Sequence, residues 1–217
     1  MNSILCAGCS HTAEFYWDPW PAYIANSTNV GIRGAGTDLV SKRVIVELEK
    51  NSYTHLIIQW PDPYRWDLYV EDEIHAEQAL PISGMQKSQR RTLVDLEGNE
   101  VDIHGYCTPG SEHRGYMKTY YKQYWSPRQH QINFWNCVLN VQLLCEKLSI
   151  DYAFLTVLDL ADYGECPFKF VDASKFLSTK GMCNYLADEG YEVQNYHYST
   201  EAHEAWANFV KIGLTLD

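Results

Sequence analysis

The stretch Ile4-Leu5-Cys6-Ala7-Gly8-Cys9-Ser10 opens with four apolar residues and then gives way to small residues and a hydroxyl side chain. A short apolar run with such a boundary is typical of a strand buried on both faces, as in a parallel sheet. Similar runs occupy residues 29–32 and 56–60, and Pro61 and Pro63 end the latter because proline cannot continue a central ladder. These runs predict three strands of an α/β fold.

A helical pattern follows the second run. Thr37 is a candidate N-cap, because a threonine side chain can accept a hydrogen bond from an N–H group of the first helical turn. Val40, Val44 and Leu48 then recur at helical spacing, and the helix is expected to end near residues 50–51. A helix between two such strands is the crossover that parallel pairing requires.

The second half of the chain repeats this alternation. The pair Ser126-Pro127 predicts the start of a long helix, which runs to about residue 148 and precedes a strand over residues 152–157. Further helices are expected over residues 173–186 and from Ser199 onward. The residues predicted to face inward from the long helix are Ile132, Trp135, Val138, Leu139, Val141, Cys145 and Leu148.

The predicted fold class is α/β, a three-layer α/β/α sandwich with a mostly parallel, flavodoxin-like sheet of about five strands. Residues 1–217 are expected to form one domain, a size at which a chain buries enough surface to fold without disulfides. The polar segment at about 67–125 does not fit the alternation and is interpreted as an insertion that covers the strand ends. Within it, residues 93–103 have the pattern of a β-hairpin.

Composition narrows the class of partner and the location. The chain has 46% hydrophobic and 21% charged residues, which is globular composition, and its formal net charge of −11 repels nucleic acid and anionic membranes. Nothing reaches the length of an apolar membrane span, and the N-terminal residues lack the basic start of a secretory signal. The seven cysteines are unevenly spaced. We therefore expect reduced thiols and a cytoplasmic protein without a signal peptide.

Ser10 and His197 are the first candidates for chemistry. Ser10 lies just past the carboxyl end of the first predicted strand, where open parallel sheets bind their ligands. His197 precedes the last predicted helix and could act as a base. Each also has an ordinary structural interpretation, Ser10 as the cap of a following helix and His197 as a surface residue. The pair is therefore more informative than either residue alone.

The order of these blocks resembles the SGNH, or GDSL-like, hydrolase family. The resemblance consists of Ser10 after the first strand, Asn-Val-Gly-Ile-Arg-Gly at 29–34 after the second, a proline-rich loop after Trp60, and His197 ahead of residues 199–207, and it covers most of the chain. Gly-Cys-Ser-His-Thr at 8–12, together with a proline-tryptophan segment and a tyrosine-rich segment, particularly resembles members encoded by bacteriophages, for which the location would be the host cytoplasm.

The resemblance implies roles for matching residues. Ser10 matches the nucleophile and His197 the general base, while the N–H groups of Ser10 and Gly34 match two oxyanion donors. Two positions depart from the family pattern. Asp62 stands where an asparagine normally supplies the third donor, and an ionised carboxylate cannot donate. Gln194 stands where an aspartate normally orients the histidine.

The resemblance implies a serine ester hydrolase or acyl-transfer enzyme acting on a small or carbohydrate-linked ester, without a cofactor or a metal. The alternative is a catalytically weakened binding or structural protein, such as a viral one, and it is motivated by Asp62 and Gln194. Two minor interpretations also remain. Cys6 and Cys9 form a C-x-x-C motif suited to redox chemistry or half of a zinc site, and His203 competes with His197 as the base.

Overall fold

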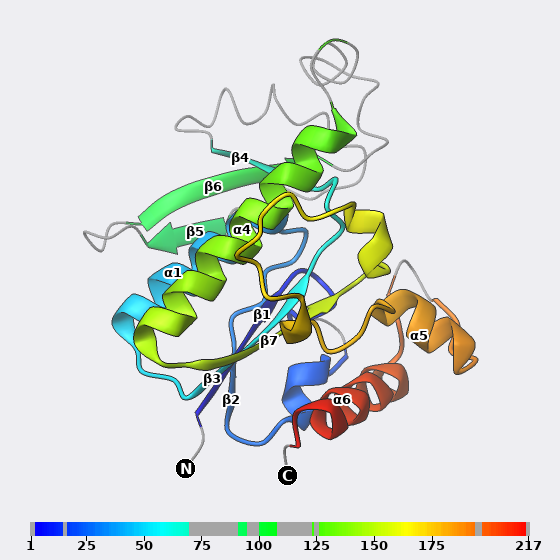
Figure 1. Cartoon of the computed structure of the whole chain (residues 1–217). Helices are drawn as coiled ribbons and strands as arrows, with labels where there is room; N and C mark the ends of the chain where they lie inside the picture. The colour runs from blue at the N-terminus through cyan, green and yellow to red at the C-terminus, as the bar shows by residue number, and fades with distance from the viewer. Residues whose placement is uncertain are drawn as a thin grey trace.

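A four-stranded parallel sheet forms the centre of the computed structural model, which describes residues 3–14, 17–69, 91–94, 100–107, 123, 126–193 and 197–215 (Figure 1). The strand order is β2-β1-β3-β7. The strands are β1 (Ile4–Gly8), β2 (Ser27–Asn29), β3 (His55–Trp60) and β7 (Asp151–Thr156). Because all pairs are parallel, β1, β3 and β7 end at the same edge, where Gly8 lies opposite Gln59 and Trp60 opposite Thr156.

Helices cover both faces of this sheet, as Figure 1 shows. On one face lie α1 (Thr37–Lys50) and α4 (Pro127–Leu148), and on the other α5 (Met182–Asp188) and α6 (Thr200–Leu214). Short 3₁₀ segments are η1 (Trp20–Tyr23), η3 (Leu160–Tyr163) and η4 (Ala173–Lys175). The predicted three-layer α/β/α architecture is confirmed.

Alternation along the strands separates two hydrophobic cores. Leu5 and Leu56 pack with α1 and α4, whereas Ile4, Cys6 and Ile57 pack with α5 and α6. Both sets are almost fully buried, which explains why these strands read as continuous apolar runs in the sequence. The sheet is thus sandwiched between two apolar layers, and its carboxyl edge is the place where polar groups collect.

Several sequence expectations about the elements are corrected. The sheet has four strands, not about five. Of the strand predicted at 29–32, only Asn29 lies in a strand, as the last residue of β2 (Ser27–Asn29). The N–H groups of Val30 and Ile32 still donate hydrogen bonds to carbonyl groups of β1, at 2.9 Å each. Leu148 is 44% exposed because it lies in the last turn of α4, beyond the sheet.

The helix predicted over residues 173–186 is divided into η4 and α5. Between them the chain runs along the outer edge of β7, where Phe176 bridges Phe154 and the Leu177 N–H donates to the Phe154 carbonyl at 3.0 Å. Gly181 then passes so close to Leu158 that a Cβ would lie 2.1 Å from its carbonyl oxygen. Pairing with the sheet edge therefore replaces helical hydrogen bonds in this segment.

The predicted hairpin is present in the region interpreted as an insertion. Strands β5 (Arg91–Val94) and β6 (Glu100–Cys107) pair antiparallel, and β4 (Trp66–Tyr69) completes a separate sheet of order β4-β6-β5. Most of the other residues between 70 and 125 lie outside the described part of the chain. Whether the insertion covers the strand ends therefore stays a prediction.

Candidate active site at the carboxyl edge of the sheet

Ser10 lies in a tight turn directly after β1. The N–H groups of Thr12 and Ala13 both donate to the Cys9 carbonyl at 2.9 Å, and no helix begins here. The interpretation of Ser10 as a helix cap is therefore wrong. Its neighbours Cys9, His11 and Thr12 are buried, whereas Ser10 itself is partly exposed. The turn presents the residue where an incoming ligand can reach it.

His197 lies beside this turn. Its ring centroid is 5.1 Å from that of His11, the residue next to Ser10, and 5.2 Å from that of Trp17. Ser199, two residues later, is the N-cap of α6, and its Oγ accepts a hydrogen bond from the Ala202 N–H. This cap fixes where α6 begins and therefore where His197 lies relative to the helix. The fold thus brings the neighbourhoods of Ser10 and His197 together from opposite ends of the chain.

Two further histidines of the site are buried. His11 is 5% exposed and His203 is 0% exposed, with its ring stacked on Trp17 at a centroid distance of 6.5 Å. Burial lowers the pKa of His203 to about 4 and holds the pKa of His11 well below its usual range, with the nearby His197 also acting on both. A neutral, fully buried imidazole cannot readily exchange protons with a substrate. His197, which is partly exposed, is the better placed base.

The loop that carries Gly34 packs against the turn of Ser10. The Ile32 N–H donates to the Gly8 carbonyl at 2.9 Å, and a Cβ on Gly31 would lie 2.7 Å from the Ala13 nitrogen. Gly34 has φ +65°, a left-handed conformation that glycine adopts at little cost. The loop that carries Gly34 is thus held against the turn of Ser10 by Gly31 and Ile32.

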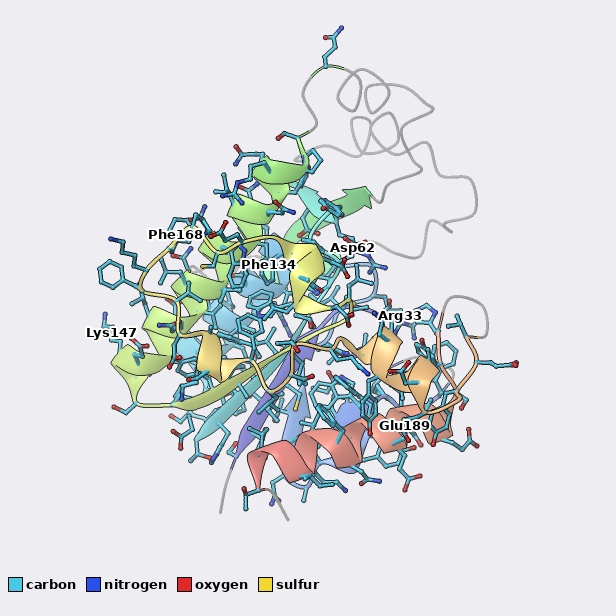
Figure 2. All side chains as sticks on the ribbon, turned by 45° about the vertical axis from the view of Figure 1, so that its right-hand side comes forward. Arg33, Asp62, Phe134, Lys147, Phe168 and Glu189 are labelled. Carbon is cyan, nitrogen blue, oxygen red and sulfur yellow. The ribbon has the colours of Figure 1, made fainter. Side chains whose placement is uncertain are left out.

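Asp62 does not act as a donor. Its Oδ1 accepts a hydrogen bond from the Tyr64 N–H at 2.8 Å, and its carbonyl accepts one from the Arg65 N–H at 3.1 Å. These bonds close a turn after β3, and Asp62 lies on the same side of the molecule as Arg33, away from Lys147 (Figure 2). The position that the resemblance assigns to the third oxyanion donor is thus occupied by a residue that accepts a hydrogen bond. Gln194 lies outside the described residues.

A buried polar cluster beneath the turn had no functional interpretation at the sequence level. Gln59 is fully buried, and its Oε1 accepts hydrogen bonds from Trp20 Nε1 at 2.7 Å and Thr12 Oγ1 at 3.0 Å. Its Nε2 lies 2.9 Å from the Met182 sulfur. The sequence contains one indication of this cluster, because Gln59 is an amide side chain inside an otherwise apolar run at 56–60. The cluster fixes the turn of Ser10 to β3 and to α5.

Arg65 is the other site residue that the sequence did not indicate. It follows the Asp62 turn, and its positive charge contributes to lowering the pKa values of both His11 and Cys183. Its Nε and Nη1 atoms are buried and have no hydrogen-bond partner among the described residues. Buried guanidinium nitrogens without hydrogen bonds are unusual, because burial of an unpaired polar group is costly.

The competing thiol and metal interpretations gain no support. Cys6 lies within β1, and burial raises the pKa of its thiol, which opposes the thiolate that redox chemistry needs. Six cysteines are free: Cys6, Cys9, Cys137, Cys145, Cys166 and Cys183. Over the described ranges, no group of three or more His, Cys, Asp or Glu residues is arranged to hold a metal ion, and no helix there is long and apolar enough to cross a membrane.

Comparisons with known proteins give no assignment: no family model matches the chain, and a search of curated proteins finds no match.

Proposed function

We propose that the protein is an SGNH-type serine ester hydrolase or acyl-transfer enzyme that acts on a small or carbohydrate-linked ester. The observation that carries the proposal is the contact of the His197 ring with His11, 5.1 Å between centroids, one residue from Ser10. Activation of a serine needs a base within reach of its hydroxyl. The partial exposure of both residues also allows a substrate to approach them.

The proposed reaction has two steps. His197 accepts the hydroxyl proton of Ser10 as Oγ attacks the ester carbonyl carbon, and the N–H groups of Ser10 and Gly34 donate to the oxyanion. The alcohol leaves with the proton from His197, and an acyl-serine remains. Water or an acceptor alcohol, deprotonated by His197, then attacks the acyl carbon; the bond to Ser10 Oγ breaks, and Oγ takes the proton back from His197, which releases the acid or the new ester. Gln194 would stand in the position of the acid that orients His197.

Substitution of Ser10 tests the proposal. Ser10→Ala removes the nucleophile, so turnover of 4-nitrophenyl butyrate is expected to fall by about 10³-fold or more, as for other serine hydrolases. His197→Ala should give a similar loss. The matched control is Ser52→Ala, an exposed serine just before β3, which should keep full turnover. Turnover that survives Ser10→Ala would reject the assignment.

The second candidate function is a binding or structural protein that has lost catalysis. It is favoured by Asp62, because its carboxylate accepts a hydrogen bond where the family pattern needs a donor. Loss of one oxyanion donor costs roughly 10²- to 10³-fold in turnover. A fluorophosphonate probe separates the two functions, since it labels an activated serine: well-folded protein that takes no label at Ser10 would favour binding.

A further inference from the structure

We infer that Trp17 is a positioning residue for His197: its indole holds the imidazole beside the turn of Ser10 and stabilises that ring when it carries a second proton. Trp17 lies between this turn and η1, and it is partly exposed. The effect of Trp17 on turnover rests on the proposed function, whereas its effect on proton binding by His197 does not.

The ring of His197 contacts rings from two parts of the chain. Its centroid lies 5.1 Å from that of His11, in the turn after β1, and 5.2 Å from that of Trp17, with interplanar angles of 45° and 39°. Rings at such distances attract each other through dispersion and through the opposite partial charges of face and edge. The two contacts together restrict rotation of the imidazole and keep it next to the turn that carries Ser10.

Trp17 is itself held against the last helix. Its ring is parallel to that of His203 to within 12°, at 6.5 Å between centroids. His203 is fully buried on α6, and the Nε1 atom of Trp17 is buried as well. An indole that is fixed in this way can order a second ring without a large further loss of conformational entropy.

The face of Trp17 suits the charge that His197 acquires in the reaction. When His197 accepts the proton of Ser10 it becomes an imidazolium, and an aromatic face attracts a cation that lies within about 6 Å of the ring centroid. The separation of 5.2 Å falls within that range, and tryptophan offers the strongest attraction of the aromatic side chains. Trp17 therefore favours the protonated state of the base over the neutral state that precedes it.

Among the described residues, the titratable groups that face His197 are His11, from the turn after β1, and His203, from α6. Burial lowers the pKa of His203 to about 4 and holds the pKa of His11 well below its usual range, so both rings are neutral near pH 7. Gln194, where the family pattern has an acid, is an uncharged amide. The aromatic face thus supplies part of the stabilisation that a carboxylate gives the imidazolium in other serine hydrolases.

Proton NMR tests the pairing without turnover. The ring signal of His197 is the one absent from His197→Gln, and its titration midpoint is measured in each variant. Trp17→Leu keeps apolar bulk but loses the aromatic face, so the midpoint should fall by about 0.4 to 0.7 pH units. Trp17→Phe should keep most of the wild-type midpoint. The control Phe170→Leu, which removes an exposed ring beside α4, should leave it unchanged. An unchanged or higher midpoint in Trp17→Leu would overturn the inference.

Kinetics test the consequence for catalysis. At pH 8, Trp17→Leu should lower kcat for 4-nitrophenyl butyrate about 2- to 30-fold with little change in KM, because Trp17 stabilises a charge that develops only in the transition state. The acid limb of the pH profile of kcat/KM should shift together with the NMR midpoint. Trp17→Phe should restore most of the lost turnover, and Phe170→Leu should lose none.

The outcomes separate this inference from the proposed function. Turnover that survives Ser10→Ala would reject the enzyme, while the NMR midpoints would still decide whether Trp17 stabilises protonated His197. A wild-type kcat in Trp17→Leu, in a protein whose turnover depends on Ser10, would refute the catalytic role of Trp17 and leave the enzyme assignment intact.

Discussion

His203 shows how burial fixes the chemistry of one residue. Neither of its ring nitrogens has a hydrogen-bond partner among the described residues, and burial lowers its pKa to about 4. The unfolded chain takes up a proton here near pH 6.5, but the folded protein resists until about pH 4. Stability from this group is therefore complete above pH 6.5 and is lost as the pH falls toward 4.

His203→Gln is expected to remove this dependence. Between pH 6.5 and 4 the free energy of unfolding of the wild type should fall more steeply, by about 1.4 kcal/mol per pH unit, than that of the variant. Urea unfolding at pH 7.5, 6, 5 and 4.5 measures both slopes, and the slope is independent of any constant cost of the substitution. Equal slopes would show that His203 is not buried in its neutral form.

The residues of the site differ in how far the sequence could indicate them. Ser10 and His197 were predicted because their positions relative to strand and helix are local features. Arg65 and Gln59 were not. Arg65 is notable because its buried Nε and Nη1 atoms have no hydrogen-bond partner in the part of the chain that the structure describes, and Gln59 because it contacts residues distant in sequence. Partners of buried polar groups depend on the tertiary fold, which spacing along the chain does not encode.

At the scale of an element, α1 is capped from a distance. The sequence predicted Thr37 as its N-cap, but the N-cap is Gly36, which has no side chain to offer, and the Thr37 hydroxyl has no partner among the described residues. Asp67 supplies the missing acceptor to the N–H groups of Gly36 and Leu39. A cap from another strand cannot be read from the helix sequence, which explains the wrong prediction.

Substitution of Asp67 should destabilise the protein through α1. Asp67→Ala leaves two N–H groups without their acceptor and is expected to cost about 1–3 kcal/mol. Asp67→Asn keeps an acceptor oxygen and carries no charge; since burial raises the pKa of Asp67 to about 6, we expect it to be milder at neutral pH. Urea midpoints at constant m-value measure both. Wild-type stability in Asp67→Ala would contradict the distant cap.

Two glycines in different surroundings, Gly181 between η4 and α5 and Gly213 in α6, are expected to respond in opposite ways to substitution by alanine. A Cβ on Gly181 would lie 2.1 Å from the Leu158 carbonyl oxygen, so Gly181→Ala must displace backbone and should cost more than about 2 kcal/mol. Gly213 lies exposed in α6, and the contact of its Cβ with Leu177, 3.5 Å, is ordinary. Gly213→Ala should therefore stabilise by about 0.5–1 kcal/mol. Thermal unfolding of both variants tests the pair, and similar midpoints would contradict it.

For the whole molecule, hydrophobic pattern was sufficient to predict the three layers. Continuous apolar runs require helices on both faces, and two separate cores fill those faces. The number of strands and the broken helix at 173–186 could not be predicted in this way, because both depend on how segments share the hydrogen bonds of a sheet edge. The spacing of apolar residues shows which face of a strand or helix is buried. Which segment pairs with the edge of a sheet depends instead on segments distant in sequence that can form the same hydrogen bonds.

The two edges of the parallel sheet bear on how copies of the protein behave at high concentration. The outer side of β7 is occupied by the chain at Phe176 and Leu177, and β2 at the opposite side is three residues long. A foreign strand therefore finds few unpaired backbone groups to add to at either side. We expect this sheet to resist strand-by-strand growth into fibrils, so that self-association through its two edges should be weak.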